Sequence, residues 1–425
     1  MKIAIVGSGI SGLVAAYRLQ RMHEVTVFEA GDYVGGHTNT VDVEMDGTRY
    51  SIDTGFIVFN DWTYPNFISL LDELEVDSQP TTMSLSVSDA TTGLEYNGHS
   101  LKTLFAQRRN LVRPSFYRML ADIVRFNRRA TKLMDNDSET MTVGEFLTKY
   151  RYSKSFSEHY LLPMGAAIWS CPMGKFREFP IRFIVEFYKN HGLLNLANRP
   201  TWRVIRGGSR SYVDAMTSSF RDQIRLCSPV IGVQRNLDHV VIQTPSQTER
   251  FDRVIFACHS DQALKILGEH ATPEEWEILS AFPYERNVAV LHTDESMLPK
   301  RKAAWASWNY RINGQADAPA SVTYNMNILQ GLQAEQTFCV TLNDQSMRPE
   351  KVLREIEYDH PVFTTARAEA QKRHVELLTA NRTSFCGAYW RNGFHEDGVV
   401  SALRVVEALN NVDLPSTTAN LAEMI

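Results

Sequence analysis

Cysteine is scarce in this sequence of 425 residues, and its distribution excludes two classes of protein. The five cysteines are widely separated and odd in number, and no two of them form a CxxC pair. A disulfide framework and a zinc site are therefore not expected, and the 12 histidines contain no HxxxH or HExxH pattern that would predict another metal site. Unpaired thiols are typical of a reducing compartment. The cysteines are Cys171, Cys227, Cys258, Cys339 and Cys386.

The sequence also lacks long hydrophobic runs and a strong excess of either charge. No stretch of about 18 consecutive apolar residues is present, so no helix is expected to span a bilayer. The apolar N-terminus is interrupted by Gly7, Gly9 and Gly12, which argues against a cleaved signal peptide and for a cytoplasmic location. With 44 basic and 49 acidic residues the net charge is -5, which argues against general nucleic-acid binding.

The composition is that of a globular protein. Hydrophobic residues make up 44% and charged residues 22%, which is enough apolar material for a core. At roughly 100–200 residues per domain, the length predicts two or three domains. No internal repeat or low-complexity tract is visible, and the sequence leaves the oligomeric state open.

The N-terminal 30 residues have the pattern of a dinucleotide-binding βαβ unit. A buried strand over 2–6 leads into a GxGxxG turn, a helix over 10–22 and a second strand over 24–28 that ends at Glu29. Such glycines permit a tight turn, a close approach of the backbone to a pyrophosphate, and close packing of helix on strand. A carboxylate after the second strand can accept both ribose hydroxyls and repels a 2′-phosphate. The predicted contacts are Gly7, Ser8, Gly9, Ile10, Ser11, Gly12, Glu29 and Ala30.

Further glycine motifs point from a general dinucleotide to FAD. A Gly-Gly pair follows the second strand, and a hairpin over 41–52 with an Asp-Gly turn leads to a second polar turn. Near the C-terminus, residues 385–390 lead to a glycine-bounded segment, 393–398, and a last helix over 398–409. In the middle, residues 229–233 read Pro-Val-Ile-Gly-Val.

These segments resemble the flavin amine oxidase and phytoene desaturase superfamily, and are most similar to bacterial FAD-dependent oxidoreductases that accompany cyclopropane-fatty-acid-synthase-like proteins. The resemblance implies non-covalent FAD, with the Gly-Gly pair against its diphosphate and ribityl chain, the C-terminal segment over the flavin, and Val230 against the adenine. His37 stands where the family commonly has arginine. The residues implied in addition to the βαβ unit are Gly35, Gly36, His37, Thr38, Asp53, Thr54, Gly55, Val230, Asp397, Gly398 and Val399.

The spread of these segments predicts an α/β fold with a discontinuous Rossmann-type FAD-binding domain and a mixed α+β substrate domain. We expect the FAD domain to comprise 1–80, 200–285 and 380–425, and the substrate domain to comprise 81–199 and 286–379. The region from about 100 to 200 is expected to be mostly helical, and strands are expected near 288–293, 320–325 and 336–342.

Three residues are candidates for a catalytic or substrate-lining role. His292 lies in a predicted strand in the region where related enzymes hold a polar group near the flavin, and Tyr389 and Trp390 adjoin the C-terminal flavin segment. The alternative for all three is packing in a sheet or a domain interface. A covalent flavin link through Cys386 is not favoured, because its neighbours do not match the motif of enzymes that have one.

Three functions remain open at this point. The first is an FAD-dependent oxidoreductase that removes a hydride from an apolar, fatty-acyl or lipid substrate. The second is an amine oxidase that produces an imine and hydrogen peroxide, and the third is a flavin-binding partner protein without catalysis. A long apolar site would favour the first, and an aromatic cage or an acid near the flavin would favour the second.

The segment 102–132 is strongly basic within an acidic chain. It has nine basic residues and one acid, a local charge of +8, and Pro114 predicts the start of a helix over 115–133. Apolar residues recur at helical spacing beside the basic ones. This stripe either packs on the substrate domain or docks on anionic lipid headgroups, which would add a peripheral membrane contact to the cytoplasmic location.

Overall fold

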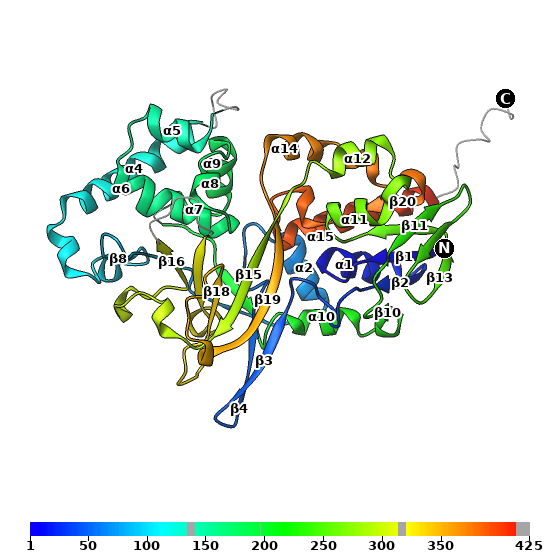
Figure 1. Cartoon of the computed structure of the whole chain (residues 1–425), viewed down its shortest axis with the longest axis horizontal. Coiled ribbons are helices and arrows are strands. Elements are labelled where there is room, and N and C mark those ends of the chain that lie inside the picture. The colour runs from blue at the N-terminus through cyan, green and yellow to red at the C-terminus, as the bar shows by residue number, and fades with distance from the viewer. Residues whose placement is uncertain (134–140, 196, 313–319, 414–425) are drawn as a thin grey trace.

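The computed structural model describes residues 1–133, 141–195, 197–312 and 320–413. One end of the molecule is built on a five-stranded sheet in which all neighbours are parallel (Figure 1). Its strands are short, and all except the partly buried edge strand over 224–225 are mostly buried, as a parallel sheet covered on both faces requires. In spatial order they are β10 (Ile224–Arg225), β2 (Glu24–Phe28), β1 (Lys2–Val6), β14 (Arg253–Phe256) and β20 (Thr383–Phe385). The predicted α/β class is confirmed.

The two faces of this sheet contact different cores because side chains alternate along each strand. Ile3 and Ile5 of β1 belong to a core beneath helices, whereas Ala4 and Val6 belong to a core beneath an antiparallel sheet. The helices are α1 (Ile10–Leu19), α2 (Pro65–Glu73), α10 (Arg210–Thr217) and α15 (His395–Asp413). The opposite layer contains β11 (Gly232–Arg235), β12 (Val240–Gln243), β13 (Thr248–Phe251), α11 (Ser260–Leu267) and α12 (Pro273–Leu279).

A second, seven-stranded sheet forms the middle of the molecule. Its neighbours are antiparallel except for one parallel pair, β16 with β7. Its two longest strands, β15 and β19, extend toward the parallel sheet and join the two halves (Figure 1). In order the strands are β19 (Val352–Pro361), β15 (Tyr284–His292), β18 (Cys339–Leu342), β17 (Ser321–Asn325), β16 (Trp308–Ile312), β7 (Leu85–Asp89) and β8 (Leu94–Asn97).

Helices with a core of their own lie at the end opposite the parallel sheet (Figure 1). This agrees with the helical character expected between 100 and 200. A five-residue π-helical turn, Ser157–Leu161, leads into one of them. The helices are α3 (Leu101–Leu104), α4 (Pro114–Leu133), α5 (Val143–Lys149), α6 (Lys154–Phe156), α7 (Leu162–Trp169), α8 (Met173–Phe176) and α9 (Ile181–Asn190).

Smaller elements connect these parts. The predicted hairpin is present as β3 (Thr40–Met45) and β4 (Thr48–Asp53), and Asp46 and Gly47 at its turn have φ of 52° and 73°. The last helix begins at His395, three residues earlier than predicted. The remaining elements are β5 (Phe59–Asn60), β6 (Ser78–Pro80), β9 (Trp202–Ile205), α13 (Met326–Gln330) and α14 (Thr365–Lys372). Within the described ranges, no helix combines the length and apolarity needed to cross a bilayer.

Candidate functional site

The turn between β1 and α1 contains glycines that serve two different purposes. A Cβ on Gly12 would lie 2.0 Å from the carbonyl oxygen of Gly7, and Gly7 itself has a φ of 104°. Packing and backbone conformation therefore require glycine at both positions. Gly9 differs, because its φ is -67° and a Cβ there would meet nothing within 4 Å. The chain itself gives no reason for glycine at position 9, but the close approach of a pyrophosphate does.

Two helix N-termini meet at this turn. The hydroxyl of Ser11 in the first turn of α1 donates to the carbonyl of Gly398 in the first turn of α15, at 3.0 Å. A Cβ on Gly398 would lie 2.7 Å from Cγ2 of Ile10, so the helices are in close contact. The first N–H groups of a helix have no partner within the helix, and its N-terminus carries partial positive charge. The pair of N-termini thus offers donors to an anionic group such as a diphosphate.

Glu29 lies at the carboxyl end of β2, where the Gly7–Gly12 turn holds its side chain. The backbone N–H and the hydroxyl of Ser8 both donate to Oε2 of Glu29, at 2.9 and 2.6 Å. The N–H of Gly31 donates to Oε1 at 2.8 Å. These bonds orient a half-buried carboxylate, and Ala30 beside it is exposed. The arrangement suits a carboxylate that accepts ribose hydroxyls.

The second glycine pair lies against the same turn. The N–H of Gly35 donates to the carbonyl oxygen of Ser8 at 3.1 Å, and a Cβ on Gly36 would lie 3.1 Å from Cα of Gly9. Both glycines have positive φ, 127° and 58°. The structure thus brings together segments that lie far apart in the sequence, since Ser11 in the first glycine turn and Gly398 at the start of α15 are 387 residues apart.

The segment before β11 reaches the other side of Glu29. The N–H of Ser228 donates to the carbonyl of Glu29 at 2.8 Å, and that of Cys227 to the carbonyl of Gly31 at 2.9 Å. Val230 follows, buried in the same core as Phe28. This places Val230 near Glu29, the neighbourhood in which the resemblance predicts an adenine contact.

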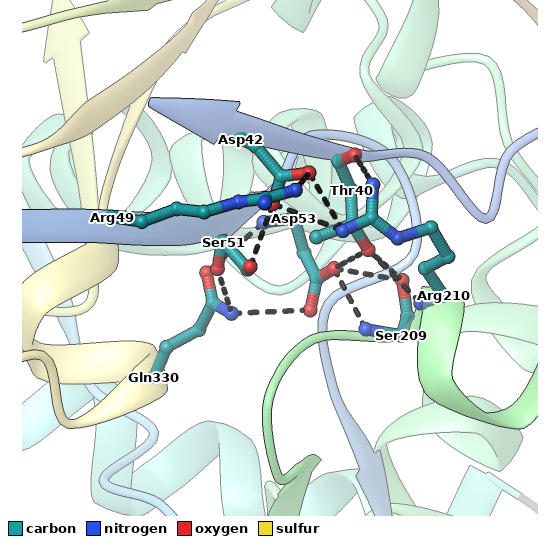
Figure 2. A network of polar contacts seen from close by, with 8 residues as sticks. All are labelled: Thr40, Asp42, Arg49, Ser51, Asp53, Ser209, Arg210 and Gln330. Atoms are coloured by element: carbon teal, nitrogen blue, oxygen red, sulfur yellow. Dashed lines mark hydrogen bonds and ion pairs between the residues drawn. The ribbon is translucent and has the colours of Figure 1, made fainter. Parts of the chain in front are cut away.

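The side chain of Asp53, for which the sequence suggested a cofactor contact, is hydrogen-bonded to protein groups in the structure. Its Oδ1 accepts hydrogen bonds from the hydroxyl of Thr40 at 2.6 Å and from the N–H and hydroxyl of Ser209, both at 2.8 Å. Its Oδ2 accepts one from Nε2 of Gln330 at 3.3 Å (Figure 2). Burial raises the pKa of Asp53 to about 6. Its carboxylate thus connects the hairpin to the start of α10 and to the last residue of α13.

The neighbours of Asp53 also bind protein partners. The hydroxyl of Thr54 donates to the carbonyl of Asn39 at 2.9 Å and lies 3.0 Å from the hydroxyl of Tyr358. A Cβ on Gly55 would lie 2.2 Å from the carbonyl oxygen of His37, so only glycine fits there. These contacts hold the segment that follows Gly36 in place.

Histidines gather where this segment meets β14 and β19. The ring of His37 stacks on Tyr358 at 4.8 Å between centroids, and lies 5.6 Å from His360 and 6.0 Å from His259. His259 stacks on Tyr284 at 4.4 Å. Burial lowers the pKa of His37 and of His259 to about 4, and that of His360 to about 3. A neutral ring cluster therefore occupies the position where the resemblance would place an arginine.

The start of α15 is fixed by a second polar network. The ring of His395 stacks on Phe56 at 3.6 Å, and its Nε2 lies 2.7 Å from the hydroxyl of Tyr212 and 3.1 Å from that of Thr38. Thr38 also contacts the hydroxyl of Tyr212. The hydroxyl of Thr38 thus forms hydrogen bonds with protein groups at the edge of the glycine segments.

The acidic residues of this segment act as helix caps. Oδ2 of Asp397 accepts the N–H of Phe394 at 2.9 Å, and burial raises the pKa of Asp397 to about 6. Glu396 accepts the N–H groups of Asn66 and Phe67 at 3.1 and 2.9 Å and so caps the start of α2. Val399 is fully buried beneath them. The capping role of Glu396 had no signal in the local sequence.

The structure gives no support to a catalytic role of His292. Its ring is buried at the end of β15 that is distant from Tyr284, the end that reaches the histidine cluster. Its Nδ1 accepts the N–H of Asp294 at 3.0 Å, and its Nε2 lies 2.7 Å from the hydroxyl of Thr341. Both ring nitrogens are therefore used within the sheet.

Tyr389 and Trp390 likewise pack in a core. Each is 2% exposed, and their rings contact Phe282 at 5.0 and 5.2 Å. Trp390 stacks on His374 at 4.0 Å. This core lies beneath α12 and α14, on the opposite face of the parallel sheet from α1 and α15. Their closeness in sequence to the flavin segment did not predict which way the side chains point.

Comparison with known proteins accounts for this arrangement. Residues 10–313 match the family described as flavin containing amine oxidoreductase. The chain belongs to this family. It is an FAD-dependent oxidoreductase, and among the described residues no cluster suited to a metal ion accompanies the flavin site. The Gly7–Gly12 turn, Glu29, the Gly35–Gly36 pair and the start of α15 are the groups that would hold the cofactor.

Individual relatives of this flavoenzyme catalyse different reactions. The 4,4'-diapophytoene desaturase of Staphylococcus aureus is 39% identical over 62 residues, which are 14% of this chain and 12% of that protein. The L-amino-acid oxidase of Pseudechis australis is 25% identical over 301 residues, 64% of this chain and 53% of that protein. The matches thus cover about half or less of these relatives' length. The structure of cyclohexylamine oxidase from Brevibacterium oxydans IH-35A has the same fold, with a TM-score of 0.68 and 15% identity over 96% of this chain and 99% of that chain.

Replacing Glu29 with alanine should weaken FAD binding by about 1–3 kcal/mol, because charge-assisted hydrogen bonds to the ribose are lost. Titration of the flavin-free protein with FAD measures this change. Ser8→Ala is the matched control, because it removes a hydrogen-bond donor to Glu29 and leaves the carboxylate. If both variants bind FAD as the wild type does, the carboxylate does not contact the ribose.

The protein should lose stability as the pH falls from about 7 to about 5. Burial lowers the pKa of seven histidines, so below pH 6.5 the unfolded chain binds more protons than the folded one. Asp53 and Asp397, with pKa raised to about 6, have the opposite effect, but they are only two. The histidines are His37, His191, His259, His292, His360, His374 and His395. Thermal unfolding across this range tests the sign, and a midpoint that rises on acidification would contradict it.

Proposed function

We propose that this flavoenzyme binds FAD without a covalent link and oxidises or desaturates an apolar, fatty-acyl or lipid-like substrate. In such a reaction bound FAD would supply the hydride acceptor. One substrate carbon gives up a hydride and its neighbour gives up a proton to water, so that a single bond becomes a double bond. The resemblance to oxidoreductases that accompany cyclopropane-fatty-acid-synthase-like proteins supports this substrate class.

The environment of the cysteines supports non-covalent binding. Cys386, in the C-terminal flavin segment, is fully buried, and burial raises the pKa of its thiol well above the ordinary value. Burial also raises the pKa of Cys258, at the end of β14, to about 12. The thiolate is the reactive form of cysteine, so neither side chain is prepared to attack a flavin.

An array of aromatic rings beside the start of α15 supports an apolar substrate. Trp169 of α7 lies 4.9 Å from Phe187 of α9, and Phe187 lies 5.3 Å from Phe394, the residue before His395. Phe183 stacks on Phe363 at 4.8 Å. Phe183, Phe363 and Phe394 are only partly buried, so part of the array faces outward. The rings thus run from the helical region to one of the segments that would hold the flavin.

A buried cation beside this array carries the choice between the two substrate classes. The guanidinium of Arg367 lies 3.6 Å from the centroid of the Phe363 ring, and the residue is 1% exposed. Burial lowers the pKa of Arg367 to about 9, so it stays charged at neutral pH. The positive charge of Arg367 repels a protonated amine at this place. It does not oppose a neutral chain, and it attracts a carboxylate.

The amine oxidase alternative has one structural observation in its favour. Asp397, three residues after Phe394, could balance a cationic amine if its carboxyl were ionised and accessible. In the structure it is 5% exposed and already accepts the N–H of Phe394. The alternative therefore needs a rearrangement of the helix start that the apolar substrate does not need.

Anaerobic bleaching of the flavin absorbance distinguishes the two functions. We expect bleaching by long-chain acyl or lipid compounds and no effect of primary amines at the same concentrations. Phe363→Asp should reduce bleaching by the apolar compounds, whereas Phe146→Leu, in the helical core, should not. Rapid bleaching by an amine, with hydrogen peroxide formed when air is admitted, would overturn the proposal.

A further inference from the structure

The outer surface of the helical end carries charge of one sign. Residues 101–133 contain nine basic side chains and a single acid, Asp122. Asp122 is 2% exposed and pairs with Arg118 at 3.4 Å and Arg125 at 2.9 Å. The segment therefore presents no exposed carboxylate. Its basic residues are Lys102, Arg108, Arg109, Arg113, Arg118, Arg125, Arg128, Arg129 and Lys132.

Large apolar side chains are exposed on the same segment. Leu101 is 77% exposed and Val112 is 82% exposed. A basic residue directly follows each of them in the sequence. Single exposed apolar residues are ordinary, but several within one short stretch mark an interaction surface. The five large apolar residues exposed between 101 and 124 are Leu101, Leu111, Val112, Tyr117 and Val124.

A rigid scaffold supports this surface. Phe116, Met119 and Phe126 on the opposite side of α4 are fully buried, so the helix cannot turn its outer face inward. The hydroxyl of Tyr117 donates to the carbonyl of Leu111 at 2.9 Å and holds the short 3₁₀ turn, Arg108–Val112, against α4.

Two of the arginines in this segment contact aromatic rings of the protein. The guanidinium of Arg125 lies 4.1 Å from the ring centroid of Tyr152, and that of Arg129 lies 4.1 Å from that of Tyr150. Both fasten α4 to the loop after α5. We define the docking surface by six exposed residues of α3, the 3₁₀ turn and the first turns of α4: Lys102, Arg108, Leu111, Val112, Tyr117 and Arg118.

We propose that this docking surface binds the headgroup region of an anionic lipid bilayer. Basic residues attract anionic headgroups, and the exposed side chains of Leu111 and Val112 fit the boundary between headgroups and acyl chains. A nucleic acid would match the charge but would leave Leu111 and Val112 exposed to water. Helix α4, which carries part of this surface, lies at the end of the molecule opposite the parallel sheet and away from the FAD-binding half (Figure 1).

The docking surface is also connected to the aromatic array. Phe126 of α4 and Trp169 of α7 belong to one hydrophobic core. Extraction of a substrate from the bilayer would use this connection, and that further step rests on the proposed apolar substrate. Membrane binding itself does not depend on it and is measured separately.

Vesicle flotation of the flavin-loaded protein tests the proposal. The vesicles are phosphatidylcholine alone and phosphatidylcholine mixed with phosphatidylglycerol, each at low and high salt. We expect binding to the mixed vesicles only, weakened by salt. Loss of two positive charges alone should weaken binding roughly thirtyfold, so Lys102→Glu with Arg108→Glu should weaken it by at least that factor. Leu111→Ser with Val112→Ser should weaken the binding that remains at high salt.

Matched controls lie on the FAD-binding half. Arg250→Glu with Lys265→Glu makes the same change of charge, and Leu237→Ser with Val375→Ser removes a leucine and a valine that are also exposed. Both control pairs should leave binding unchanged. Indifference of the wild type to both vesicles, or equal losses in the controls, would overturn the proposal. So would binding to DNA as tight as to the mixed vesicles, with no effect of the serine variants. Anaerobic bleaching by a substrate in solution should be unchanged in the docking variants. A loss of vesicle binding is thereby distinguished from a failure of the proposed reaction.

Discussion

Replacement of Gly9 by valine should give a folded protein that holds no flavin. The position tolerates a side chain within the chain itself, since φ is -67° and a Cβ there meets nothing within 4 Å. The added methyl groups would fill the space through which a pyrophosphate approaches the two helix N-termini. Flavin absorbance per mole of purified protein measures the loss, and circular dichroism and thermal unfolding verify the fold.

Gly12→Ala provides the contrast within the same turn. Its Cβ would lie 2.0 Å from the carbonyl oxygen of Gly7, so α1 would have to move away from β1. We expect this variant to lose stability and flavin together, whereas Gly9→Val loses flavin alone. A Gly9→Val protein that purifies with full flavin would show that the cofactor does not cross this turn.

Replacement of Asp53 by alanine should lower the unfolding free energy by about 3–5 kcal/mol. The groups that donate hydrogen bonds to Asp53 would remain buried without a partner. These donors belong to Thr40, Ser209 and Gln330, on three different elements (Figure 2). Urea denaturation with the flavin content held constant measures the change.

Asp42→Ala is the control on the same hairpin. Burial alone would raise the pKa of Asp42, but hydrogen bonds from Arg49, Ser51 and Arg210 lower it to about 2. Because its side chain is 22% exposed and Arg49 is largely in solvent, we expect a loss of about 1 kcal/mol or less. Loss of flavin in Asp53→Ala without loss of stability would instead support the cofactor contact that the sequence suggested.

The parts of the structure that the sequence predicted well have local signals. Strand β1, the glycine turn and β2 follow from apolar runs and from glycine spacing within one stretch of 30 residues. The hairpin follows from its Asp-Gly turn, and α4 from Pro114. The start of α15 was predicted three residues late, because His395 is an unusual first residue of a helix and the contacts that hold it come from Phe56 and Tyr212.

The parts that the sequence did not predict depend on contacts between distant residues. His37 joins Tyr358 and His360 only because β19 passes beside the glycine segment, more than 300 residues later in the chain. Asp53 contacts Ser209 and Gln330 because these distant segments of the chain meet beside the hairpin. His292 lies in the expected region of the chain, but that position alone does not give the direction in which a buried side chain points.

The most direct test of this account is to denature the purified protein and identify what it releases. We expect a yellow protein whose flavin absorbance, after denaturation and filtration, passes entirely into the filtrate as FAD, in about one equivalent per chain. Flavin that stays with the denatured chain would contradict the non-covalent binding. A colourless protein that cannot be reconstituted with FAD would contradict the role assigned to the glycine segments and Glu29.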